Sequence, residues 1–248
     1  MIAVTNKQIL PRSPETVMQS ERIGSLHPTR ISFVRSLIRR MSKEKWIISR
    51  DVFDLSSEGY GTLTFKVITP YGIITLVCFS NKIPNKDRTD RVIADRWDAS
   101  FVLVNGEVKE KDIDRLRENA PLQELGRFKK CDLVLSRANK SIRLFNHCIE
   151  CLSRGAQPEL SQLLNVGYLM RTTAVYGNGK FGLSDLENVR VGKIFMRPYE
   201  AELLTVYLIR LFSFDLIDHI AKSSNPDIAV PMGDEAKRAL GVGNATGL

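Results

Sequence analysis

The sequence predicts an α+β fold, with a small antiparallel sheet and flanking helices in the N-terminal half and a mainly α-helical C-terminal half. Two patterns support this prediction. Apolar and polar residues alternate over residues 60–69, a turn follows at Pro70-Tyr71-Gly72, and residues 73–80 return as a more apolar strand. Residues 199–222 are apolar on nearly all sides, which is typical of a buried helix.

The chain is long enough to bury a substantial core, because it has 248 residues of which 43% are hydrophobic. Strand patterns precede residues 126–130 and helical patterns follow them. We therefore expect an α+β part over residues 29–126 and a helical part over residues 127–248, packed together as one globular unit.

The net charge of +8 is concentrated at the N-terminus. Residues 1–50 carry ten basic and three acidic side chains, a balance of +7 that leaves +1 for the other 198 residues. An anionic partner should therefore meet this part of the chain. Residues 1–28 hold three prolines and no sustained period, so we predict a mobile basic arm. This arm lacks the apolar core of a secretory signal.

A helix of about fifteen residues is predicted after Thr29, which can cap it. Its apolar stripe leaves a basic face formed by Arg35, Arg39, Arg40 and Lys43. This face could bind phosphates of nucleic acid or acidic lipid, or it could be the solvated side of an ordinary amphipathic helix.

The remaining elements of the first half are predicted as follows. Residues 46–53 and 99–104 should add strands beside the hairpin, and residues 111–119 should form a short surface helix. Between the strands, residues 81–98 alternate Asp with Arg and include a predicted short helix near residues 91–97. Internal ion pairs or a carboxylate pair on a loop at the sheet edge would both explain this composition.

In the second half, apolar residues at steps of three and four predict one helix over residues 132–154. This helix contains Cys148 and Cys151. A zinc site normally needs a second pair, which Cys78 and Cys131 do not supply at the usual spacing, and a redox pair would sit at a helix N-terminus. We therefore predict unreactive thiols and no metal site. Four cysteines without a secretory signal fit a reducing, cytoplasmic compartment.

The best candidate binding site follows a helix predicted from Glu159. That helix should end at Gly177, and Asn178-Gly179 should form a tight turn with exposed backbone N–H groups. Arg171, Tyr176, Asn178 and Lys180 would then suit a carboxylate or phosphate. The order is helix then turn, so this is not a phosphate-binding P-loop, and the glycines could simply stop the helix.

Residues 234–240 are predicted as a short helix followed by a glycine-rich turn at Gly241, Gly243 and Gly247. These glycines are not a dinucleotide fingerprint, because no strand precedes them and no helix can follow. A chain that stops inside such a turn predicts that Leu248 is not the native terminus.

Four stretches together resemble an uncharacterised family of longer bacterial proteins: Trp97-Asp98 and residues 135–140, 169–182 and 241–247. The resemblance covers Ile31 to the end of the chain. It implies further sequence beyond the final glycines, but it implies no catalytic residues, because no activity is associated with the family.

The sequence therefore leaves three functional hypotheses. The favoured one is binding or turnover of a small anionic compound at the 171–182 turn, and the alternative is nucleic-acid association through the basic helix over residues 30–45. The third is a subunit whose apolar surface is covered by missing sequence. No apolar run approaches the length of about 18 residues needed to span a bilayer. The pattern leaves cofactors, enzymatic activity and oligomeric state open.

Overall fold

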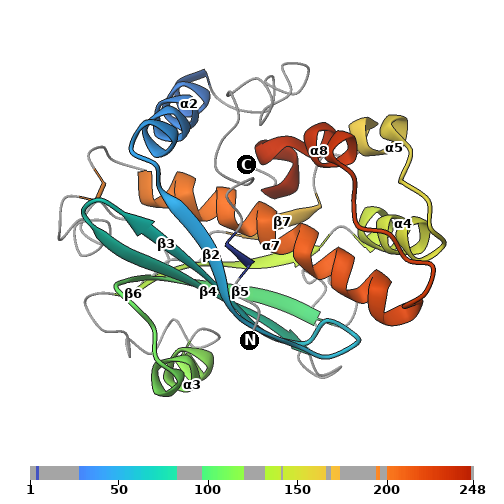
Figure 1. Ribbon diagram of the computed structural model, residues 1–248, viewed down its shortest axis with the longest axis horizontal. Helices are drawn as coiled ribbons and strands as arrows, with labels where there is room; N and C mark the ends of the chain where they lie inside the picture. Colours follow the sequence, from blue (N-terminus) through green and yellow to red (C-terminus); the bar gives the residue numbers. More distant parts are fainter. Residues whose placement is uncertain are drawn as a thin grey trace.

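The computed structural model describes residues 4–5, 28–82, 97–119, 132–140, 142–165, 169–173, 194–195 and 200–246. In these residues the strands form one seven-stranded antiparallel sheet, in which each strand pairs with the next along the chain (Figure 1). The strands are β1 (Val4–Thr5), β2 (Ile47–Leu55), β3 (Gly61–Thr69), β4 (Gly72–Lys82), β5 (Trp97–Asn105), β6 (Asp132–Lys140) and β7 (Met170–Thr173).

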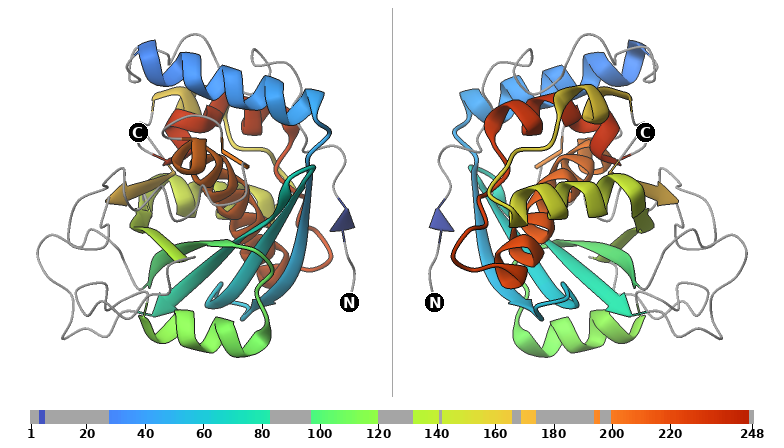
Figure 2. Two further views of the ribbon diagram at one scale, coloured as in Figure 1. Left: turned by 90° about the vertical axis from the view of Figure 1, so that its left-hand side faces the viewer. Right: turned by 90° about the vertical axis from the view of Figure 1, so that its right-hand side faces the viewer.

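The helices lie on both faces of this sheet but are unequally distributed. The described helices are α2 (Pro28–Lys43), α3 (Glu110–Asn119), α4 (Ile142–Ser153), α5 (Leu160–Asn165), α7 (Glu200–Ser224) and α8 (Asp234–Thr246). Helix α7 crosses one face, and α2, α4 and α8 pack around it, whereas α3 covers the opposite face (Figure 2). None of the described helices, α7 included, is long and apolar enough to cross a membrane.

The main core lies between the sheet and α7. Alternate residues of β3, Leu63, Phe65 and Val67, point into it, as the two-residue period of a strand requires. Phe101 of β5 meets Phe212 of α7 edge to face, with ring centroids 5.4 Å apart. A smaller core on the other face joins the sheet to α3 and consists of Val77, Phe79, Val102, Val104, Ile113 and Leu116.

The predicted fold class is confirmed. The hairpin of β3 and β4 turns at Pro70-Tyr71, and strands near residues 46–53 and 99–104 and helices near residues 29–43, 111–119 and 199–222 are all present. The short helix expected near residues 91–97 lies outside the described residues, except for Trp97, which begins β5.

Three local predictions are wrong. Residues 132–140 form β6, not the first half of a helix, and only Ile142–Ser153 is helical. The helix expected from Glu159 ends at Asn165, and Met170–Thr173 is a strand. In both cases pairing with a neighbouring strand overrides a local apolar period. Helix α8 runs through Gly241 and Gly243 to Thr246, where a glycine-rich turn was expected, since glycine weakens a helix by only about 1 kcal/mol.

Candidate functional site

The structure describes only part of the predicted anion site. The backbone of Arg171 lies in β7, where it pairs with Asn139 of β6, and α8 packs beside this strand. Tyr176, Asn178 and Lys180 lie outside the described residues, as does the side chain of Arg171. Arg171 therefore lies in β7, the last strand in the order of the sheet. The other three predicted contacts follow this strand in the sequence.

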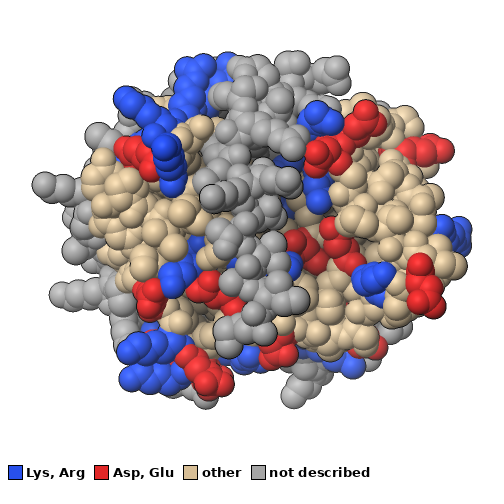
Figure 3. Space-filling model, in the orientation of Figure 1, with Lys and Arg blue, Asp and Glu red and all other residues tan. Residues whose placement is uncertain are grey.

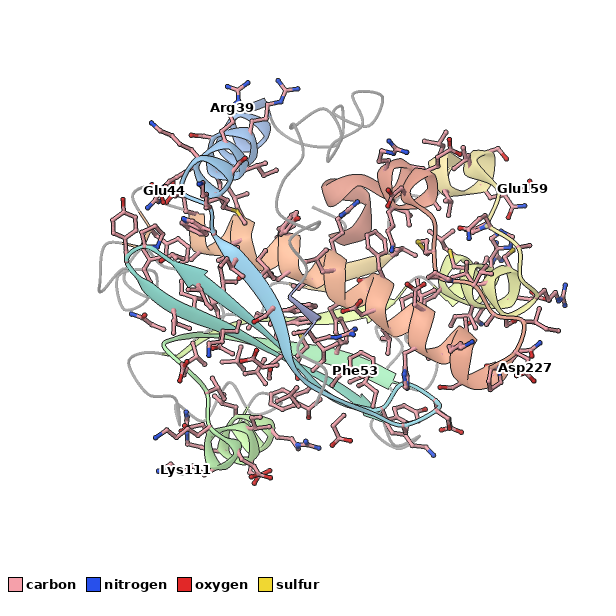
Figure 4. All side chains as sticks on the ribbon, viewed as in Figure 1. Arg39, Glu44, Phe53, Lys111, Glu159 and Asp227 are labelled. Atoms are coloured by element: carbon pink, nitrogen blue, oxygen red, sulfur yellow. The ribbon has the colours of Figure 1, made fainter. Side chains whose placement is uncertain are left out.

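The predicted basic face of α2 is divided by the packing of this helix against α7. Arg39 and Lys43 are exposed, whereas Arg35 is half-buried. Figure 4 shows Arg39 on the outer side of α2, and Figure 3 shows basic side chains gathered over this helix. Two of the four predicted phosphate contacts are thus exposed.

Arg40, the fourth member of that face, is held inside the protein. Its side chain is 11% exposed, with Nε 3.0 Å from Glu44 Oε1 and Nη1 3.0 Å from Glu200 Oε2. Its guanidinium also lies 5.3 Å from the centre of the Trp46 ring. Burial opposes ionisation of Glu44, but hydrogen bonds from Trp46 and Arg40 outweigh it and lower the pKa of this carboxyl. Arg40 therefore ties α2 to the first turn of α7.

Sequence reasoning missed a second polar cluster, on the side of α7 that faces β2 and α8. Arg50 Nη1 lies 3.2 Å from Asp215 Oδ2, and Lys237 Nζ lies 4.0 Å from Asp218 Oδ2. Asp218 Oδ1 also accepts a hydrogen bond from the backbone N–H of Met232. We call Arg50, Asp215, Asp218 and Lys237 the polar seam. The signal in the sequence was a pair of carboxylates three residues apart in the mostly apolar helix α7.

The seam contains a carboxyl group that can exchange protons near neutral pH. Burial raises the pKa of Asp215 to about 6, although the neighbouring Arg50 opposes this shift. Burial also raises the pKa of Asp218, against the hydrogen bond from Met232. Such groups are found at catalytic sites and in structural ion-pair networks alike. The seam lies along β2, near one edge of the sheet, whereas Arg171 lies on β7 at the other edge.

The two helical cysteines have the properties of unreactive thiols. Burial raises the pKa of Cys148 to about 12 and also raises that of Cys151, which keeps both thiols protonated at neutral pH. Cys151 Sγ lies 3.7 Å from His147 Nε2, which corresponds to a weak sulfur hydrogen bond. Within the described residues, no group of three or more His, Cys, Asp or Glu side chains could hold a metal ion.

Comparisons with known proteins add no assignment. No protein-family model matches the chain, and neither a curated protein nor a solved structure matches it. The resemblance to a family of longer bacterial proteins stays a prediction.

Proposed function

We propose that the protein binds, or turns over, a small compound bearing a carboxylate or phosphate at the segment formed by residues 171–182. The observation that supports this proposal is the position of Arg171 in β7, the last strand of the sheet, two residues before that strand ends. Segments that leave a rigid sheet commonly carry binding residues, because the sheet fixes where they start.

The chemistry of the segment suits an oxyanion. A guanidinium such as that of Arg171 donates two parallel hydrogen bonds to a carboxylate or phosphate, and Lys180 adds a point charge. Tyr176 and Asn178 supply neutral donors, and an Asn178-Gly179 turn would expose backbone N–H groups. In this proposal the four residues surround one anionic group of the ligand.

The test is native mass spectrometry of the freshly purified protein, followed by titration with inorganic phosphate and acetate. We expect Arg171→Ala and Lys180→Ala each to weaken anion binding by about tenfold or more, because each removes a charge-assisted hydrogen bond. Lys111→Ala is the matched control, since Lys111 is exposed on α3, on the opposite face of the sheet. Equal affinity in all four proteins, or an equal loss in the control, would contradict the proposal.

Nucleic-acid association through α2 is the alternative, and the exposed pair Arg39 and Lys43 favours it. These residues are four apart, so they lie on one side of the helix. Because Arg40 is engaged in ion pairs and Arg35 is half-buried, we expect about two phosphate contacts. This number predicts a log–log salt slope of about −2 on duplex DNA. A flat salt response, or binding unchanged in the Arg39→Ala, Lys43→Ala double variant, would exclude this alternative.

A further inference from the structure

In the described part of the chain, the outer half of β2 is paired with the sheet along one edge. The register between β2 and β3 shifts between Arg50 and Val52, and β1 pairs only with Ser49 and Arg50. Among the described residues, positions 52–55 of β2 therefore pair with β3 alone, and Asp51 lies at the bulge without a register partner. A bulge disrupts the backbone ladder locally and an edge strand has an unpaired side, so side-chain contacts add to the pairing that holds this part of β2 in place.

Those side-chain contacts lead from β2 to the C-terminal half of α7. The Arg50 guanidinium meets Asp215 at 3.2 Å and lies 4.4 Å from the centre of the Phe53 ring. Phe53 packs edge to face on His219, with ring centroids 5.1 Å apart, and His219 Nε2 lies 2.7 Å from the backbone oxygen of Ser56. Figure 4 shows Phe53 between β2 and this part of α7. The Arg50–Asp215 ion pair is thus one end of a continuous chain of contacts that runs through Phe53 and His219 to Ser56.

Asp215 is surrounded by charged or titratable groups from each element that packs on it. Arg50 approaches it from β2, Cys78 from β4 and Lys237 from α8, and Asp218 lies one turn further along α7. Cys148 of α4 lies on the Asp218 side of the cluster. Of these groups, Arg50 is the ion-pair partner within 4 Å of Asp215. The state of Asp215 therefore decides whether Arg50 has its counter-ion.

We propose that the Arg50–Asp215 ion pair is an acid-sensitive latch, which holds the outer half of β2 against α7 and opens when Asp215 is protonated. Protonation removes the negative charge opposite a guanidinium that is itself only 29% exposed. A partly buried cation without a counter-ion is unfavourable, so Arg50 turns toward solvent. Its stacking on Phe53 is then lost, and residues 50–55 exchange more readily between paired and open states.

This latch differs from ordinary acid unfolding in its effect on total stability. The pKa of Asp215 is about 6 in the folded protein, above the ordinary value of 3.8, so the folded state binds the proton more tightly than the unfolded state. The contribution of Asp215 to the free energy of unfolding therefore rises as the pH falls from about 6 towards about 4. Over this pH range, residues 50–55 should therefore open more often, although protonation of Asp215 raises the free energy of unfolding of the whole protein.

Hydrogen–deuterium exchange of the backbone amides tests the proposal. We expect protection of residues 50–55 to fall about threefold to tenfold between about pH 7.5 and about pH 5, after correction for the intrinsic exchange rate, as for loss of a partly buried ion pair. Protection of β4 should not change, because this strand is paired on both sides. Urea unfolding at each pH verifies that the protein stays folded.

Three variants make the test specific. Asp215→Asn and Arg50→Gln should each show the low protection of residues 50–55 at both pH values. Asp218→Asn should keep the pH response and shift it to lower pH, because the Asp218 charge raises the pKa of Asp215. The latch is refuted if protection of residues 50–55 in the unmodified protein is the same at both pH values. It is also refuted if Asp215→Asn is as protected at about pH 7.5 as the unmodified protein.

Discussion

Replacing Gly61 by alanine is expected to lower the free energy of unfolding by roughly 3 kcal/mol or more, which is a large part of the total stability of a typical domain. Gly61 opens β3 with φ at 142°, and a Cβ on it would lie 2.0 Å from the backbone oxygen of Asp54. A backbone atom of the paired strand cannot rotate away as a side chain can. The end of the β2–β3 ladder, where Gly61 pairs with Leu55, would have to open.

Gly106 provides the matched control. It also has a positive φ, of 115°, but no described atom lies within 4 Å of the Cβ that alanine would add. Gly106→Ala should therefore cost only the backbone strain, roughly 1 kcal/mol. Urea unfolding of both variants separates the effect of the steric clash from that of the backbone strain. Equal losses would show that strain dominates at Gly61, and a loss below about 1 kcal/mol there would contradict the predicted clash.

The elements that were predictable from the sequence are those specified by local signals. The β3–β4 hairpin has a two-residue apolar period on both sides of a Pro70-Tyr71-Gly72 turn, and these signals lie within twenty-one consecutive residues. Helix α7 is apolar over a length that a strand does not reach. In each case the pattern that specifies the element lies within the element itself or in the adjoining turn.

Strand β6 was not predictable in this way, because its partner is distant in the sequence. Residues 132–140 pair with β5, with Val102 opposite Val134 and Ala99 opposite Ala138. Without knowledge of the partner strand, the local sequence indicates a longer helix, because Ala138 and Ile142 extend the apolar stripe of the following helix by one turn. Pairing with the free edge of β5 decides the outcome, and a local period contains no information about that edge.

Each candidate site likewise has features that can be read from the sequence and features that depend on packing. The basic face of α2 could be read from the sequence, but its division into exposed Arg39 and Lys43 and buried Arg40 depends on where α7 begins. Asp215 was recognisable as a carboxylate that needs a partner inside an apolar helix. Its partner Arg50 lies in β2, and only the packing of the helix on the sheet brings them together.

Replacing Arg40 by methionine is expected to lower the free energy of unfolding by roughly 3 kcal/mol. Methionine keeps much of the apolar stem but removes the cation that faces Glu200, whose side chain is 5% exposed. A buried carboxylate that loses a cationic partner is more destabilising than the pair was stabilising. Urea unfolding of the purified variant measures the loss.

Arg39→Met is the control for this change, because Arg39 is exposed on the same helix and should tolerate the substitution within about 0.5 kcal/mol. Equal stability of the two variants would contradict the structural role of Arg40. The comparison also determines how the nucleic-acid alternative has to be tested. Loss of DNA binding in an Arg40 variant would follow from displacement of α2, whereas loss in the Arg39→Ala, Lys43→Ala protein, with unfolding unchanged, would identify phosphate contacts.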